Sequence, residues 1–172
     1  CVSIEHSKHV VSQFQAAGIP AAHVDGETNV DERDAAIKRF EQGEIRVLCN
    51  VELFGEGFDL PAIEVAILLR PTQSLGLYLQ QVGRALRPSP GKSEALILDH
   101  AGNVARHGLP DQERVWSLEG VERRKQSDDG PAVSVRICGK CFAAQPFGAA
   151  ACFHCGHVFE LKPREVKQVD GD

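Results

Sequence analysis

The sequence has no methionine, one tryptophan, one tyrosine and no excess of positive charge. It also lacks any apolar run near the roughly 18 residues of a membrane-spanning helix. Charges at Glu5 and Lys8 interrupt the place where a signal peptide would be apolar. With 42% apolar residues and a formal charge of −5, the 172-residue chain is typical of a soluble globular protein. We therefore expect a cytoplasmic protein with no membrane partner.

The missing methionine leads to a second expectation. A translation product keeps or loses an initiator methionine, whereas this chain opens on Cys1 to Ile4, a strand-like run. We expect the chain to be a piece of a longer protein whose front portion is absent.

Four of the six cysteines form two pairs with C-x2-C spacing, Cys138 with Cys141 and Cys152 with Cys155. Two such pairs can bring four thiolates to one tetrahedral Zn²⁺. Gly156 follows the second pair and permits the positive φ that a turn around a metal often needs. A disulfide or a redox pair fits less well, because nothing indicates secretion and a redox site needs only one pair. The pattern predicts a four-cysteine zinc module, with iron as the alternative metal.

The other side chains of this module have two interpretations. His154 and His157 are expected to be bystanders, since four cysteines complete the metal shell. Exposed aromatic rings could stack on bases, but a module of about 30 residues also needs aromatic side chains for a core, and we expect that role. The aromatic residues are Phe142, Phe147, Phe153 and Phe159, and the cations are Arg136, Lys140 and Lys162.

Residues 1 to about 118 alternate short apolar runs with amphipathic stretches, the pattern of βαβ units. The fold class is therefore expected to be α/β, with an open parallel sheet flanked by helices. Strands are predicted at 1–4, 20–24, 45–49, 63–69, 95–99 and 113–118. Three helices are predicted between them: one through Val10 and Phe14 that Gly18 ends, one opening at Thr28 or Asn29 that Gly43 ends, and one from Ser74 to about Leu86.

Composition divides the chain into four parts. The α/β region is expected over 1–120, a charged linker over 121–132 and the zinc ribbon over 133–162. The remaining residues, 163–172, have few apolar side chains and are predicted to form a flexible tail.

The third predicted helix separates apolar from polar side chains. At 100° per residue, its leucine–valine stripe spans about 60° and its polar set lies roughly 120–180° away. Gly83 lies between the two sets and would let another segment approach closely. Without further context the polar set could be a solvated face. The stripe is Leu75, Leu79, Val82 and Leu86, and the polar set is Gln80, Arg84 and Arg87.

The segment after the strand 45–49 favours a ligand site. In an open parallel sheet, ligands bind at the carboxyl ends of strands, where loops expose backbone N–H groups. Gly55 and Gly57 make such a loop compact, and Asp59 supplies an acceptor that can hold a ribose hydroxyl. Together with the arginine-bearing helix, this segment indicates half of a nucleotide site.

Four landmarks over residues 1 to about 118 resemble the superfamily 2 helicases. Residues 56–61 look like motif V of that family, and residues 80–87 match its motif VI pattern, Q-x-x-G-R-x-x-R. The opening strand with residues 3–7 lies where motif IV would be. The stretch from His23 to Gly26, followed by Arg33 and Phe40, is similar to the region between motifs IV and V.

The resemblance implies the second RecA-like domain of a two-domain motor, of the P-loop NTPase type, which shares ATP and Mg²⁺ with an N-terminal RecA-like domain. It implies that Arg87, or second Arg84, is an arginine finger that neutralises charge on the transferred phosphoryl group. A guanidinium suits this role because it stays charged and can bond two phosphate oxygens at once. The nucleotide-binding set that it implies is Gly57, Asp59, Gln80 and Gly83.

The phosphate-binding loop of the other half is missing from this sequence. The nearest match is Gly91-Lys92-Ser93, but Leu86 stands where the first glycine should fall, so we interpret the triplet as a turn. We therefore expect these 172 residues alone to show no ATPase activity.

The resemblance places single-stranded nucleic acid across both halves, with Ser7, Thr28 and Asn50 as candidate contacts. Val51 stands where many relatives have a threonine, and valine cannot donate to a phosphate. DNA is favoured over RNA, because glutamine rather than histidine opens motif VI. Two alternatives stay open: a non-catalytic zinc-ribbon scaffold that binds nucleic acid and retains the helicase fold, and a free-standing nucleotide-binding α/β domain.

Overall fold

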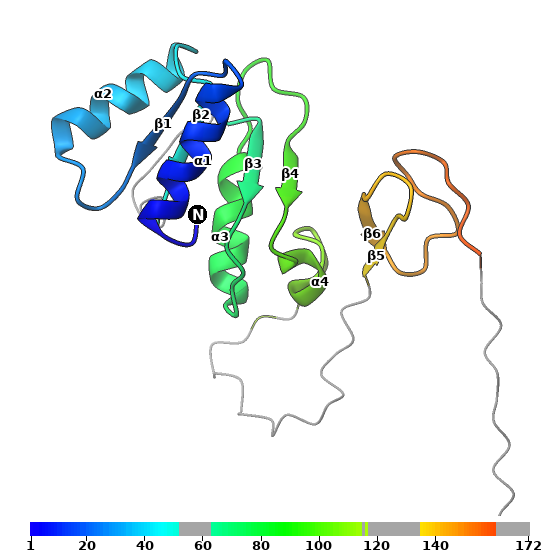
Figure 1. Ribbon diagram of the computed structural model, residues 1–172. Coiled ribbons are helices and arrows are strands. Elements are labelled where there is room, and N and C mark those ends of the chain that lie inside the picture. Colours follow the sequence, from blue (N-terminus) through cyan, green and yellow to red (C-terminus); the bar gives the residue numbers. More distant parts are fainter. Residues whose placement is uncertain (52–62, 115, 117–134, 161–172) are drawn as a thin grey trace, which may run out of the picture. The chain divides into compact units, whose positions relative to one another are not determined.

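The structure is a computed structural model that describes residues 1–51, 63–114, 116 and 135–160. It divides into two compact units, Cys1–Pro110 and Asp111–Asp172. Figure 1 shows helices and short strands in the first unit and a small hairpin module in the second. Within the described part of the chain, every helix is too short or too polar to cross a membrane.

The first pair of strands packs against α1 (Ile4–Ala16). Strands β1 (Ala21–Val24) and β2 (Val47–Asn50) run parallel, with Ala21 opposite Val47, and α2 (Val30–Glu41) connects them. Helix α1 packs its apolar side on both strands. The core of this half consists of Val11, Ala21 and Cys49, with Cys1, Val10, Phe14 and Val47 packed around it.

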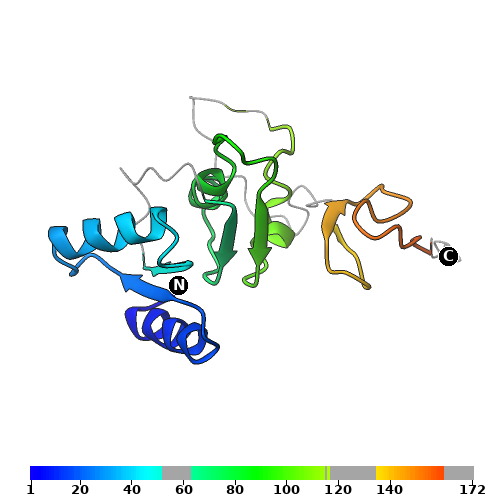
Figure 2. The same cartoon turned by 90° about the horizontal axis from the view of Figure 1, so that it is seen from above.

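The second pair of strands carries α3 (Leu75–Ala85). Strands β3 (Val65–Leu68) and β4 (Leu96–Asp99) also run parallel, and α4 (Asn103–His107) follows β4. Figure 2 shows α1 and α3 on opposite sides of the strands. The core between α3 and the strands β3 and β4 consists of Leu68, Tyr78 and Val82, with Leu75, Leu79 and Ile97 packed against it.

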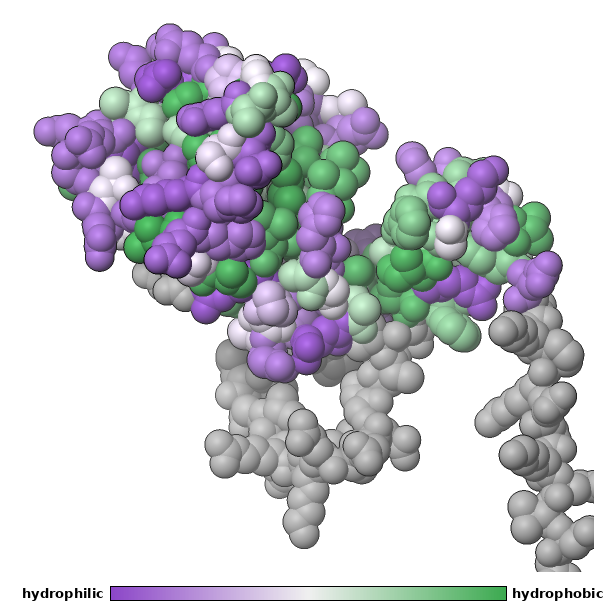
Figure 3. Space-filling model, in the orientation of Figure 1, coloured by the Kyte–Doolittle hydropathy of each residue, from purple (hydrophilic) through white to green (hydrophobic). Residues whose placement is uncertain are grey.

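These two parallel pairs confirm the predicted α/β class with flanking helices. In the described residues the four strands form two separate two-stranded sheets. The side of β3 and β4 away from their core is apolar as well, and Figure 3 shows hydrophobic side chains over it. Apolar residues on both faces are the pattern of parallel strands. The exposed residues there are Val65, Ile67, Leu96 and Leu98.

The helix starts correct two predictions. Residues 1–4 form no strand, because the Ser3 side chain accepts a hydrogen bond from the His6 N–H at 3.1 Å and caps α1, which begins at Ile4. The second helix is capped by Asn29, which accepts from the Glu32 N–H at 2.8 Å, so the alternative start at Thr28 is wrong. The predicted start of α3 at Ser74 is confirmed.

Glycines end the first two helices as predicted. Gly18 and Gly43 have φ of 75° and 76°, the left-handed region that glycine adopts without steric cost. After α1, the Ile19 N–H reaches back to the Phe14 carbonyl at 2.9 Å, and the Glu44 N–H does the same to the Arg39 carbonyl after α2. These are Schellman endings.

The second unit is described over 135–160. Strands β5 (Val135–Ile137) and β6 (Ala144–Pro146) pair antiparallel. Of the predicted strand 113–118, the described residues 113, 114 and 116 belong to no strand. The predicted linker 121–132 and tail 163–172 lie outside the described residues, and the proposed domain boundaries stay predictions.

A buried asparagine fixes the segment that leads into α3. Asn103 is fully buried, its Oδ1 accepts from the Thr72 N–H at 2.9 Å, and its Nδ2 donates to the Arg70 carbonyl at 3.0 Å. The Tyr78 hydroxyl donates to the Gly108 carbonyl at 3.1 Å, which ties α3 to the end of α4. The start and the rotation of α3 are therefore set by hydrogen bonds as well as by packing.

We predict that Asn103→Ala destabilises the chain by about 2–3 kcal/mol, because it removes the hydrogen bonds that Asn103 makes to a buried N–H and to a partly buried carbonyl. The matched control is Asn29→Ala, which removes an exposed cap and should cost about 1 kcal/mol. Chemical denaturation measures both free energies of unfolding. Equal losses for the two variants would contradict the role given to Asn103.

Candidate functional site

The buried face of α3 differs slightly from the predicted apolar stripe. Tyr78, Val82 and Ala85 are buried, whereas Leu86 is the C-cap and is 50% exposed. At 100° per residue, the buried face is rotated by roughly 60° from the predicted one. Leu75 and Leu79 still pack at its border. The stripe was therefore right in three of its four members.

Gln80 and Arg84 stay on the far side of the helix after this rotation, roughly 170° and 130° from the centre of the buried face. Arg87 follows the C-cap Leu86 and lies just after the end of α3. Gln80 is exposed, and the two arginines are half-buried. A Cβ added at Gly83 would meet no described atom within 4 Å, so this side of the helix is open to an approaching segment.

Lys92 closes the end of α3. Its ammonium group donates to the Ala85 carbonyl and, at 2.8 Å, to the Arg87 carbonyl. Gly91 has a φ of 81°, and the Lys92 N–H closes a turn onto the Ser89 carbonyl. The triplet is thus a turn, as predicted, and its lysine stabilises the helix end that bears the arginines.

The motif V residues Gly57 and Asp59 lie outside the described residues. Asn50, the last residue of β2, is half-buried at the carboxyl end of that strand. Its carbonyl accepts from the Cys1 ammonium group at 2.9 Å. Cys1 therefore lies beside the end of β2.

Ser7 lies in the second turn of α1 rather than at its start, and it is 0% exposed. Its hydroxyl pairs with His23 Nδ1 at 2.7 Å, and His23 Nε2 pairs with Asp25 Oδ2 at 2.8 Å. The prediction that Ser7 contacts nucleic acid is therefore not supported by its position. The same burial excludes a hydrolase-like role for this Ser–His–Asp array, which joins α1 to β1.

Thr28 belongs to the same array. Its hydroxyl donates to Asp25 Oδ1 and accepts from the Asp25 N–H, both at 2.9 Å. Asp25 Oδ1 also accepts from the N–H groups of Glu27 and Thr28. The array closes the turn between β1 and α2. Sequence reasoning missed it, although the His-Val-Asp-Gly run was noted.

The hydrogen bond with His23, which has the larger effect, and the one with Thr28 lower the pKa of Asp25 to about 2. Because the pKa of Asp25 in the fold lies below its unfolded value of about 3.9, the ionised carboxylate stabilises the fold above that value. This contribution is lost as the pH falls from about 4 to about 2.

We predict that wild type is more stable than Asp25→Asn near neutral pH and that the two free energies of unfolding converge between about pH 4 and about pH 2. Denaturant titration at several pH values measures the difference. Asp34→Asn removes an equal charge from an exposed position and corrects for net charge. A difference that does not depend on pH would contradict the account.

The four paired cysteines come together in the second unit, as predicted. Their sulfurs all lie within 4.8 Å of one another. Cys138 and Cys155 are 3.7 Å apart, and Cys141 and Cys152 are 3.5 Å apart. Tetrahedral coordination with Zn–S bonds of about 2.3 Å needs sulfurs about 3.8 Å apart, so the set fits such an ion.

Backbone hydrogen bonds prepare one thiol for ionisation. The backbone N–H of Cys155, which has the larger effect, and that of His154 lower the pKa of Cys152 to about 6. The N–H of Ala143 acts to lower the pKa of Cys141, but burial and the neighbouring sulfurs outweigh it and raise that pKa to about 12. A cation at the centre would favour the thiolates and release their protons.

The aromatic side chains of this unit do not form the expected core. Phe142, Phe147 and Phe153 are 77%, 59% and 79% exposed. Figure 3 shows hydrophobic side chains on the surface of this unit. The interior consists instead of Cys138, Cys152 and Gln145. The interpretation as core was wrong for these three rings, because the cysteine cluster occupies the space that a core would fill.

The family model named helicase conserved C-terminal domain matches residues 1–89. The chain belongs to this family. A 51.5 kDa protein of a Lactococcus phage is 41% identical over 167 residues, which cover 96% of this chain and 36% of the phage protein. The protein irc3 of Schizosaccharomyces pombe, named as a mitochondrial ATP-dependent helicase, is 39% identical over 109 residues, covering 63% of this chain and 18% of irc3.

Solved structures agree on the fold of this helicase domain. The DEAD-box protein SrmB of E. coli gives a TM-score of 0.53 at 24% identity, covering 62% of this chain and 66% of that chain. The C-terminal domain of the DEAD-box protein Dbp5 gives 0.52 at 17% identity, covering 62% and 64%. The helicase domain therefore has the RecA-like fold of the superfamily 2 helicases, as the motifs predicted. The chain spans only about a third of the phage relative.

Proposed function

We propose that the chain is the second motor domain of an ATP-dependent superfamily 2 helicase or translocase, followed by a zinc ribbon. The observation that supports this most strongly is α3, which keeps Gln80 and Arg84 on the side away from its buried face and is followed directly by Arg87. These side chains are donors of the kind that bind phosphate oxygens. The N-terminal RecA-like domain of the same protein is the proposed partner.

In this proposal ATP with Mg²⁺ would lie between the two domains, where ATP would supply the phosphoryl group and Mg²⁺ would neutralise charge on the phosphates. Arg87 is the first candidate for the finger and Arg84 the second, and each would neutralise charge that develops on the transferred phosphoryl group. Gln80 would couple nucleotide state to domain closure. Gly57 and Asp59 would contribute backbone and a ribose contact, and Gly83 would admit the partner segment.

The proposed track is single-stranded nucleic acid, with DNA favoured over RNA because Gln80 opens motif VI. Asn50 at the end of β2 and Thr28 remain candidate contacts, although the Thr28 hydroxyl is engaged with Asp25. The chain carries a net charge of −5, so this part alone offers little electrostatic affinity for phosphates.

We predict that Arg87→Ala in the complete protein leaves ATP affinity within about threefold and lowers hydrolysis by about 10³–10⁵-fold, as loss of a finger does elsewhere. The matched control is Arg39→Ala, whose guanidinium pairs with Glu44 at 3.1 Å on the surface of α2. Nucleotide titration and steady-state hydrolysis with and without single-stranded DNA or RNA measure both quantities.

Hydrolysis that survives Arg87→Ala would contradict the role of that residue. A complete wild-type protein that binds nucleic acid without any hydrolysis would favour the non-catalytic scaffold instead. The 172 residues alone should show no turnover, because the lysine of their one P-loop-like triplet is engaged by the carbonyls of Ala85 and Arg87.

We predict one bound Zn²⁺ per chain, held by Cys138, Cys141, Cys152 and Cys155. Cys152→Ser should abolish stoichiometric binding, because it removes one of four ligands, while Cys49→Ser should keep the metal since its thiol lies in the other unit. Elemental analysis of purified protein measures the metal. Full zinc content in Cys152→Ser, or iron in its place, would contradict the assignment.

A further inference from the structure

Phe142 has an unusual backbone conformation. It is the one non-glycine residue of the described chain with a positive φ, at 61°. The corresponding position after the second cysteine pair is Gly156, with a φ of 70°. Glycine adopts this left-handed region without strain, whereas a side chain there meets the backbone. The chain thus carries a bulky residue at a position where its own second knuckle uses glycine.

Burial does not offset this strain. The Phe142 ring is 77% exposed, so folding removes little of its apolar surface from water. The hydrogen bond that Phe142 makes in the turn, from its N–H to the Cys138 carbonyl at 2.9 Å, uses only the backbone and would be the same with glycine. A strained and exposed residue that stability does not explain points to function.

Phe153 is a second exposed ring beside the cysteine cluster. It directly follows Cys152, as Phe142 directly follows Cys141, and the two sulfurs are 3.5 Å apart. Its ring is 79% exposed, and its N–H donates to Oε1 of the buried Gln145 at 3.0 Å. Both rings are therefore carried by backbone that hydrogen bonds hold in place, and both face water.

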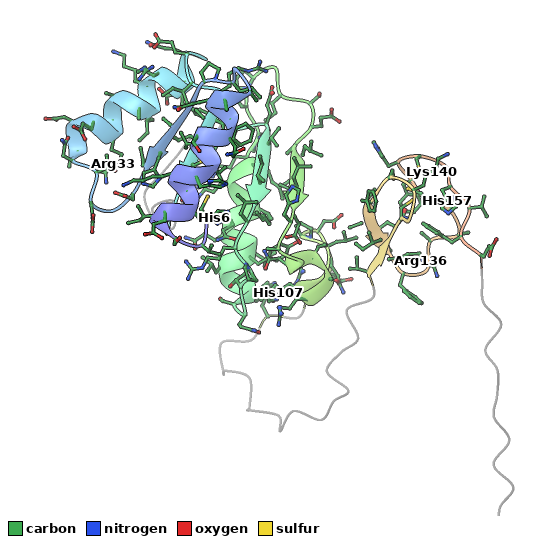
Figure 4. All side chains as sticks on the ribbon, viewed as in Figure 1. His6, Arg33, His107, Arg136, Lys140 and His157 are labelled. Carbon is green, nitrogen blue, oxygen red and sulfur yellow. The ribbon has the colours of Figure 1, made fainter. Side chains whose placement is uncertain are left out.

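The described stretch 135–160 also carries two cations, Arg136 and Lys140. The Arg136 guanidinium lies 4.9 Å and 4.7 Å from the ring centroids of Phe147 and Phe159. Lys140 is exposed between the first two cysteines, and Figure 4 labels both cations on this unit. Glu160 is the one carboxylate of the described stretch 135–160. A zinc tetrathiolate would add a charge of −2, so affinity for a polyanion must come mainly from the rings.

We propose that Phe142 and Phe153 form a stacking platform for unpaired bases of single-stranded nucleic acid, with Lys140 contacting a phosphate. Every base offers a π face, so the platform binds with little sequence preference. The site lies outside the helicase domain and does not depend on the assignment of the arginine finger.

The test uses the zinc-loaded 172-residue chain and a fluorescent oligothymidylate of about 12 nucleotides, a length within known single-strand site sizes. Phe142→Gly and Phe153→Ala should each weaken binding by about 5- to 100-fold in fluorescence anisotropy, the range expected for one stacked base. Phe142→Gly should keep its zinc and melt at the same or a higher temperature, because glycine relieves the positive φ. Val158→Ala, at another exposed apolar position of this unit, should bind as wild type does.

Salt dependence and a second substitution separate stacking from other binding. The logarithm of the binding constant should fall with the logarithm of salt concentration with a slope of only about −0.7, since Lys140 makes the one proposed phosphate contact. Phe142→Leu should lose affinity as Phe142→Gly does, while Arg39→Ala, on the surface of α2, should not change it.

Three outcomes would overturn the proposal. One is unchanged binding in Phe142→Gly and Phe153→Ala. Another is a loss of zinc or a lower melting temperature in Phe142→Gly, which would make the ring structural. The third is wild-type affinity in Phe142→Leu, or a sedimentation coefficient of the chain that changes in Phe142→Gly and Phe153→Ala while nucleic-acid binding does not. Either result would indicate that the rings dock on a protein or on a second copy of the chain.

Discussion

The burial of one side of α3 is the constraint on which the helicase domain depends. Tyr78 and Val82 pack against Leu68 of β3, and the Tyr78 hydroxyl bonds to the Gly108 carbonyl. A helix of 11 residues held by this face can present only its opposite side to another domain. The positions of Gln80 and Arg84 thus follow from the packing of apolar residues that take no part in chemistry, and Arg87 lies just after the end of the same helix.

Both ends of this helix are also fixed. Asn103 holds the segment before α3 through the Thr72 N–H and the Arg70 carbonyl. In the neighbouring α4, the ring of His107, labelled in Figure 4, stacks on Tyr78 with ring centroids 5.4 Å apart. Lys92 holds the last carbonyls. A guanidinium stabilises a transition state only if it is already in position, because reorganisation would consume the gain. The same buried groups that stabilise the domain therefore orient its arginines.

Much of this domain could be predicted from local chemistry. Ser74 as a cap, Gly18 and Gly43 as helix ends, and the cysteine spacing each act within a few residues, so the sequence shows them directly. Long-range relations were missed. The fully buried Ser7 bonds to a histidine 16 residues away, and the exposure of the zinc-module phenylalanines depends on the cysteine cluster that takes their place inside. Strand-like residues 1–4 were misassigned because a serine cap outweighed their apolar composition. The arginine-finger role rests on the motif and on the placement of Arg84 on the outward side of α3 and of Arg87 just after it, and it stays a prediction.

The arginine-finger role of Arg87 is tested most directly by comparing two affinities of the complete protein. One is its affinity for ATP, and the other is its affinity for ADP together with a fluoride-based mimic of the transferred phosphoryl group. Arg87→Lys keeps the positive charge but removes the bidentate geometry of the guanidinium. The account predicts that this variant loses at least about tenfold in affinity for the mimic and less than about threefold for ATP, because a finger binds the transition state more tightly than the ground state. Equal losses for both ligands, or none for either, would contradict it.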